Sequence, residues 1–180
     1  MTGTARFSAC GTYRWWLERC WDPERPPLLF IGLNPSRADA ERDDPTLRRL
    51  LAFARSWGYG RLEVLNLFAR ITPSPAVLRR STAPVGAEND RWLQERVMAV
   101  ASVSGALWLG WGNCGALHRR DQQVLRRLAC WTGVPEAAAL TVPWLTLGLT
   151  ALGQPRHPLY VAGDARPLRL LHSGSELCVL

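Results

Sequence analysis

The sequence predicts an α/β protein, a three-layer α/β/α sandwich with a mainly parallel, four-stranded central sheet. Apolar runs bounded by glycine or proline recur along the chain, as is typical of strands buried on both faces of a sheet. Segments with helical periodicity and helix-capping residues separate these runs, and this alternation implies right-handed crossovers between parallel strands. A length of 180 residues suits one domain, so we expect residues 1–180 to form a single unit.

The first third of the chain predicts two strands and a helix. Residues about 7–22 include "CGTYRWWLERCW" and predict an edge strand or an aromatic flap on the core. The run "PPLLFIGLN", residues 26–34, predicts the first buried strand. In the helix that follows, Asp44 can act as the N-cap, Pro45 suits the first turn, and Gly58 ends the helix.

The remainder continues the same alternation and ends in irregular segments. Three further strands are expected at 61–69, 105–112 and 142–150, with helices at 88–101 and 115–131. A proline-rich loop at 72–90 is placed to cover a site. The tail runs from about 162 to 180, and its last residues are expected to fray.

The charge balance favours a polyanionic partner. The net charge is +7, and all 22 basic residues are arginine. GC-rich coding alone can produce arginine-only usage, but guanidinium groups also suit bidentate contacts with phosphates. We therefore expect a nucleic acid, DNA first, as partner. The chain lacks the ~18-residue apolar run of a membrane span and the layout of a signal peptide, so we expect no membrane contact and a cytoplasmic location.

The cysteines indicate no cofactor. The chain has five, without a C-x-x-C or H-x3-H spacing for zinc. Their separations match no iron–sulfur cluster spacing either. We expect buried thiols, no metal and no cofactor.

Polar and aromatic side chains follow the predicted strands. In open α/β sheets ligands bind outside the carboxyl ends of the strands, so segments far apart in sequence meet at one edge. The residues expected at that edge are Asn34, Ser36, Asn66, Phe68, Trp111 and His157.

The turn after the first strand is the first candidate for chemistry. Gly32 permits close backbone approach, Pro35 stiffens the exit, and Asn34 can orient a water or a base edge. Ser36 is a candidate nucleophile, although no G-x-S-x-G elbow surrounds it. The alternative is a helix-capping turn without chemistry.

The other edge residues also have two interpretations each. A neutral His157 can donate to a developing anion on a leaving group, or it is a structural loop histidine. Asn66 either reads a ligand or pins the backbone. Trp57, Phe68 or Trp111 can stack on a planar ligand.

An acidic cluster follows the turn. Asp44 is most simply the helix cap. Asp43 and Asp39 are candidate accessory acids, as a base or as Mg²⁺ ligands, but acids before a helix usually complement its dipole.

Taken together, these segments resemble a known family. The string "CGTYRWWLERCW…FIGLNPSRADAERDDPTLRR…LNLFA…GQPRHPLY", from Cys10 to Tyr160, resembles the bacterial family called domain of unknown function 1643. That resemblance implies no activity.

A more distant resemblance does suggest one. "GLNPS" is similar to the first motif of the uracil-DNA glycosylase superfamily, whose Asn orients the attacking water, and this role falls on Asn34. "VLNLFA" is similar to the strand whose Asn reads the base, which falls on Asn66, and "RHPLY" resembles the His-Pro motif beside the flipped base, which falls on His157. The resemblance implies a glycosylase-like fold. The family's Ser and leucine wedge are replaced by Leu159 and Tyr160 after Pro158, and Leu159 is the candidate wedge.

The resulting hypothesis is a glycosylase that hydrolyses the N-glycosidic bond of a flipped damaged, mismatched or modified base. The chain has no lysine for a Schiff base, so we expect a monofunctional enzyme. The alternatives are an enzyme acting on free nucleotides or nucleosides, and a non-catalytic nucleic-acid-binding module.

Overall fold

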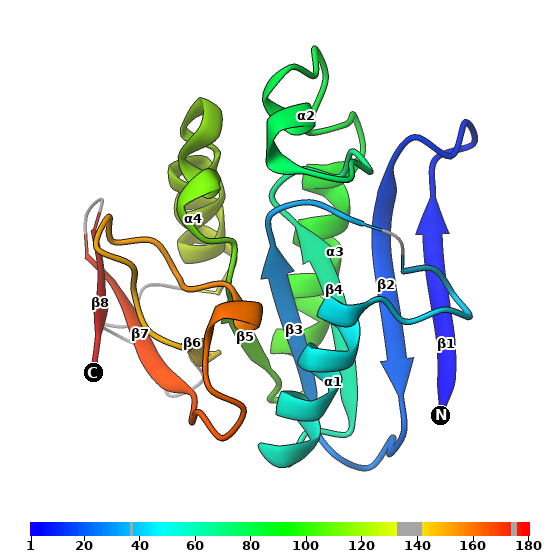
Figure 1. Cartoon of the computed structure of the whole chain (residues 1–180). Helices are drawn as coiled ribbons and strands as arrows, with labels where there is room; N and C mark the ends of the chain where they lie inside the picture. Colours follow the sequence, from blue (N-terminus) through cyan, green and yellow to red (C-terminus); the bar gives the residue numbers. More distant parts are fainter. Residues whose placement is uncertain (37, 133–141, 174–175) are drawn as a thin grey trace.

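The computed structural model describes residues 1–36, 38–132, 142–173 and 176–180. One mixed sheet of eight strands, in the order β1-β2-β4-β3-β5-β6-β7-β8, runs across the molecule (Figure 1). The strands are β1 (Thr2–Phe7), β2 (Arg14–Cys20), β3 (Pro27–Gly32), β4 (Arg61–Asn66), β5 (Ala106–Leu109), β6 (Trp144–Thr146), β7 (Leu168–Ser173) and β8 (Glu176–Val179). The α/β class is therefore confirmed.

The predicted sheet of four strands is wrong in number. The four predicted strands are β3, β4, β5 and β6, and they do pair in parallel at the centre of the sheet. Four antiparallel strands extend it, β1 and β2 beyond β4, and β7 and β8 beyond β6. Most residues of β1, β7 and β8 are exposed or half-buried, so these strands lack the apolar runs that reveal a buried strand.

Both ends of the chain also differ from expectation. The segment predicted as an edge strand or flap contains β2, which lies between β1 and β4, so the edge is β1 instead. The last residues of the tail, which were predicted to fray, form β8, and β8 pairs with β7.

Helices cover both faces of the sheet, giving three layers. In Figure 1, α1 lies in front of the sheet, and α3 and α4 lie behind it. The helices are α1 (Pro45–Ser56), α2 (Pro75–Arg79), α3 (Asn89–Ala101) and α4 (Arg120–Thr132), with 3₁₀ helices at Asn113–Arg119 and Pro158–Tyr160. Within the described residues, none of these helices has the length and apolar character needed to cross a membrane.

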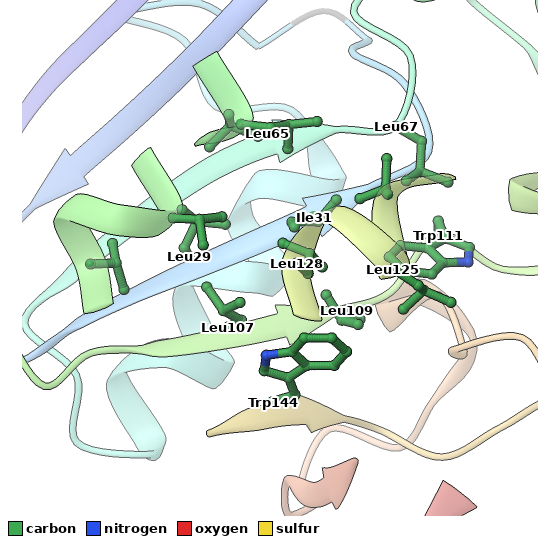
Figure 2. Packing of buried hydrophobic residues seen from close by; sticks show 14 of the residues in the cluster. Leu29, Ile31, Leu65, Leu67, Leu107, Leu109, Trp111, Leu125, Leu128 and Trp144 are labelled. Carbon is green, nitrogen blue, oxygen red and sulfur yellow. The ribbon is translucent and has the colours of Figure 1, made fainter. Parts of the chain in front are cut away.

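Alternating side chains of the central strands build the two cores. Leu29 and Ile31 of β3 pack in the cluster that includes the apolar faces of α3 and α4 (Figure 2). Their neighbours Leu28 and Phe30 pack against α1 on the opposite face. This period of two is the pattern of a strand buried on both sides.

The start of α1 follows the predicted capping residues. The side chain of Asp44 accepts a hydrogen bond of 2.8 Å from the backbone N–H of Leu47, and Pro45 occupies the first turn. Gly58 follows the helix with φ of +87°, a conformation that favours glycine. These caps set where the amino end of α1 lies, and this end borders the site described next.

Candidate functional site

A cavity of about 720 Å³ opens at the carboxyl ends of the parallel strands. Its walls come from the segments after β3, β4, β5 and β6, the first residue of β2, the amino end of α1 and the loop that leads into α2. The volume lies within the ~300–1,000 Å³ of small-molecule sites. The cavity therefore lies at the carboxyl ends of the strands, where open α/β sheets bind their ligands.

The structure brings most of the predicted site residues together on this cavity. The predicted residues that line it are Gly32, Asn34, Ser36, Asn66, Trp111, His157 and Leu159. Leu159 is 44% exposed, and Tyr160 beside it is 84% exposed, so an apolar and an aromatic side chain project into solvent next to the cavity. Ser36 is also exposed.

Three of the apolar predictions do not line the cavity: Trp57, which packs against the core cluster on the α1 side, Phe68 and Pro35. Phe68 is fully buried in the core cluster on the α3 and α4 side of the sheet, so it is not free to stack on a ligand there. Phe30 and Trp111 are the aromatic residues of the inner wall instead. Pro35 is buried, and its carbonyl accepts the backbone N–H of Thr72 at 3.3 Å. Pro35 therefore holds the turn in place without lining the cavity.

The two candidate accessory acids also lie outside the cavity wall. Asp43 forms a 2.8 Å ion pair with Arg19. One carboxylate oxygen of Asp39 accepts the backbone N–H groups of Glu41 and Arg42, and these bonds lower the pKa of Asp39. Both acids hold the loop before α1, and the prediction that they serve the site is not supported by their positions.

The side-chain amide of Asn34 has a fixed orientation. Its Nδ2 donates to the carbonyls of Pro35 at 3.0 Å and Thr72 at 3.2 Å, and to Oγ1 of Thr72 at 2.9 Å. Because Nδ2 faces acceptors only, reversing the amide would place oxygen against oxygen. Asn34 therefore presents Oδ1 as its available acceptor, as the positioning of a water requires.

His157 is arranged as a neutral donor. Its Nδ1 accepts the backbone N–H of Leu159 at 3.3 Å, so in the neutral ring the proton resides on Nε2. Burial lowers the pKa of His157, and the nearby carboxylate of Asp44 opposes this shift. The ring is thus held uncharged at neutral pH with a donor available.

Asn66 is the most deeply buried of the predicted polar residues. It is 4% exposed, and its Nδ2 has no hydrogen-bond partner among the described residues. Its backbone carbonyl accepts Nδ2 of Asn89 at 3.1 Å, so the backbone is held by another residue. The neighbouring Gly32 makes room, since a Cβ there would lie 3.1 Å from Oδ1 of Asn66. These contacts leave the Asn66 amide for a ligand, because it is not needed to pin the backbone.

Sequence reasoning missed several polar residues of the cavity, among them Arg14, Asp44, Thr72 and Arg156. Arg14 begins β2, and because β2 runs antiparallel to β4, its first residue lies at the carboxyl edge of the parallel strands. A search limited to residues that follow parallel strands overlooks the first residue of an antiparallel neighbour. Asp44 was assigned to the cap, which it forms, but it is also the one carboxylate among the described residues of the wall.

The cysteines differ from the expectation of buried thiols. Cys10, Cys130 and Cys178 are exposed, Cys20 and Cys114 are half-buried, and all five are free. Over the described ranges, no group of three or more His, Cys, Asp or Glu side chains is placed to hold a metal ion.

Comparison with known proteins identifies a family without an assigned activity. A family model described as "Protein of unknown function (DUF1643)" matches residues 14–159. This range contains every residue of the cavity wall except Tyr160. A search of curated proteins and a search of solved structures each gave no match. The link to the uracil-DNA glycosylases therefore stays a prediction.

Proposed function

The chain belongs to the DUF1643 family, whose description names no activity, and from the cavity itself we propose that it is a monofunctional glycosylase. In this proposal it hydrolyses the N-glycosidic bond of a damaged, mismatched or modified base flipped out of DNA. The observation that carries the proposal is the convergence of Asn34, Asn66 and His157 on one cavity from three separate segments. Each of these side chains offers the atom that its role requires.

Water attack is assigned to the Asn34 side of the cavity. Oδ1 of Asn34 accepts a hydrogen bond from the water, whose oxygen forms a bond to C1′ of the sugar. Asp44 is the carboxylate of the described wall that can accept the proton released by this water. The glycosidic C1′–N bond breaks, and its electron pair leaves with the base.

Base recognition and charge stabilisation are assigned to the other two residues. The Nε2–H of His157 donates to the base as negative charge develops on it. Nδ2 of Asn66 donates to an acceptor on the base edge. Phe30 and Trp111 supply apolar wall, and Leu159 is the candidate wedge that enters the base stack.

The test is a panel of oligonucleotides with modified bases, scored for abasic sites. We expect release from at least one substrate, and a loss of about 100-fold or more in Asn34→Ala and in His157→Gln. His118→Gln is the matched control, since His118 is exposed and does not line the cavity. Base release that is unchanged in both site variants would contradict the proposed mechanism. Salt-sensitive DNA binding that leaves every base intact would identify a binding module instead.

The monofunctional assignment has its own test. A lyase step requires an amine that forms a Schiff base with the sugar, and the chain contains no lysine. We therefore expect borohydride to trap no covalent adduct between DNA and a side chain of this protein.

A second candidate, an enzyme acting on free nucleotides or nucleosides, is favoured by the size of the cavity. At about 720 Å³ it has room for a base together with its sugar. Turnover of free nucleotides without turnover of oligonucleotides would support this candidate over the first.

A further inference from the structure

Arg14 is a buried arginine of the cavity wall without a carboxylate partner. It is 4% exposed, and no described carboxylate lies within 4.0 Å of its guanidinium group. The two other buried arginines are each paired, Arg19 with Asp43 and Arg120 with Asp90. Since a buried charge is usually paired, the missing partner of Arg14 needs an explanation.

The hydrogen bonds of Arg14 leave one edge of the guanidinium free. Nη1 donates to the carbonyl of Ala38 at 2.9 Å. Nε is buried without a partner, and Nη2 donates to no described residue. Nε and Nη2 together form an edge with two parallel N–H donors, a geometry that matches two oxygens of a carboxylate or phosphate.

A second unpartnered donor lines the same cavity. Nδ2 of Asn66 is also buried without an acceptor, and the residue is 4% exposed. Arg14 and Asn66 thus both have N–H donors that lack an acceptor among the described residues. Such a set favours a ligand rich in oxygen acceptors.

The remaining charges of the wall agree with an anionic ligand. Burial lowers the pKa of Arg14 to about 10, which reflects the cost of holding this charge away from water. Asp44 opposes that shift, and it is the one carboxylate on the described wall. Arg156 supplies a second guanidinium, while His157 is held neutral.

We propose that the cavity binds an oxyanion group of its ligand, a phosphate or a carboxylate, through the Nε and Nη2 edge of Arg14, while Nδ2 of Asn66 donates to another acceptor of the same ligand. This inference concerns binding alone and does not depend on cleavage of a glycosidic bond. It adds to the proposed function an anionic group on the molecule that enters the cavity.

The experiment measures ligand-induced changes in melting temperature at constant ionic strength. The probes are inorganic phosphate, acetate, 2′-deoxycytidine 5′-monophosphate and 2′-deoxycytidine, with chloride as reference. We expect phosphate or acetate to raise the Tm, and the more effective of the two identifies the oxyanion. If it is phosphate, titration calorimetry should show the monophosphate binding about tenfold more tightly than the nucleoside. This difference corresponds to one bidentate, charge-assisted contact between the phosphate and Arg14.

Three variants separate binding from folding. Arg14→Met should keep or raise the Tm of the free protein, because it removes an unpaired buried charge, and should abolish the response to the oxyanion. Arg14→Lys keeps the charge but loses the two parallel N–H donors of the guanidinium edge, so the rise in Tm caused by the oxyanion should be smaller. Arg19→Met is the matched control on the same strand, equally buried but paired with Asp43, and it should lower the Tm while keeping the response.

Three outcomes would overturn the proposal. In the first, neither phosphate nor acetate raises the Tm of the wild-type protein. In the second, a folded Arg14→Met protein keeps the full response. In the third, both Arg14 variants fail to fold while Arg19→Met folds, which would show that Arg14 is a structural residue.

Discussion

The hydroxyl of Thr72 and the carbonyls of Pro35 and Thr72 together fix the orientation of the Asn34 amide. Oγ1 of Thr72 donates its proton to the carbonyl of Ser74 at 3.2 Å, and so it receives Nδ2 of Asn34 at 2.9 Å as an acceptor. The direction of this chain of hydrogen bonds leaves Oδ1 as the acceptor that Asn34 offers to a water. Thr72 is thus a positioning residue for the proposed reaction.

Replacement of Thr72 by valine should therefore lower turnover more than substrate binding. We expect a decrease of about tenfold or more in kcat for base release with little change in KM, because a misoriented Asn34 affects the water and not the base. The two lost hydrogen bonds of the hydroxyl should together cost about 1–3 kcal/mol of stability, measured by urea unfolding. Thr72→Ser keeps the hydroxyl and should restore kcat, and equal kcat values in Thr72→Val and wild type would contradict the role.

His157 should make stability fall as the pH is lowered. Burial holds the pKa of His157 below its usual 6.5 in the folded protein, so the unfolded chain binds this proton first as the pH falls. The associated stability is fully present above pH 6.5 and is lost as the pH falls through the lower, folded-state pKa. Melting temperatures measured between neutral and acidic pH should fall less steeply in His157→Gln than in wild type. The exposed His118 provides the control, and His118→Gln should retain the wild-type slope.

Gly32 should tolerate no side chain. A Cβ at this position would lie 2.8 Å from Cε1 of Phe30 and 3.1 Å from Oδ1 of Asn66, so both cavity residues would have to shift. We expect Gly32→Ala to cost about 1–3 kcal/mol of unfolding free energy and to weaken ligand binding. Gly163→Ala is a fair comparison, because its Cβ would meet only the flexible end of Arg49, at 3.2 Å. A similar cost in both variants would argue against tight packing around Gly32.

Cys10 should be the most reactive thiol. Hydrogen bonds with Ser8 and Thr12 lower its pKa to about 7, and the residue is exposed. Because the thiolate is the nucleophile, iodoacetamide at neutral pH should alkylate Cys10 before the exposed Cys130 and Cys178. Peptide mass spectrometry over a time course measures this order. Alkylation of Cys178 at the same rate as Cys10 would show that the hydrogen bonds do not activate the thiol.

The central part of the fold could be predicted because its signals are local. Continuous apolar runs marked β3 to β6, and Asp44 and Pro45 marked the start of α1. The outer strands could not be predicted this way. A strand such as β1 is mostly exposed or half-buried, and its place in the sheet comes from hydrogen bonds to β2 rather than from an apolar pattern.

The candidate site was predictable where residues lie at the end of a parallel strand or in the loop after it. Asn66 ends β4, Asn34 follows β3, His157 lies in the loop after β6, and all three line the cavity. Phe68 comes two residues after Asn66, so regular alternation would place both side chains on the cavity face. Instead β4 ends at Asn66, and Leu67 and Phe68 both pack in the core cluster on the α3 and α4 side. The position of Arg14 at the cavity depends on the antiparallel pairing of β2 with β4, which is a non-local property of the sheet.

The position of β2 also bears on how the molecule forms during synthesis. Arg14 leaves the ribosome well before its partner strand, because β2 pairs with β4, and β4 ends only at Asn66. The opposite wall arrives still later, with His157. Because chains are made from the amino end at about 5–20 residues per second, synthesis from Arg14 to His157 takes roughly 7–30 seconds, and the Arg14 side chain stays hydrated until the cavity forms. Ligand can therefore stabilise this protein only after nearly the whole matched region, residues 14–159, has been made.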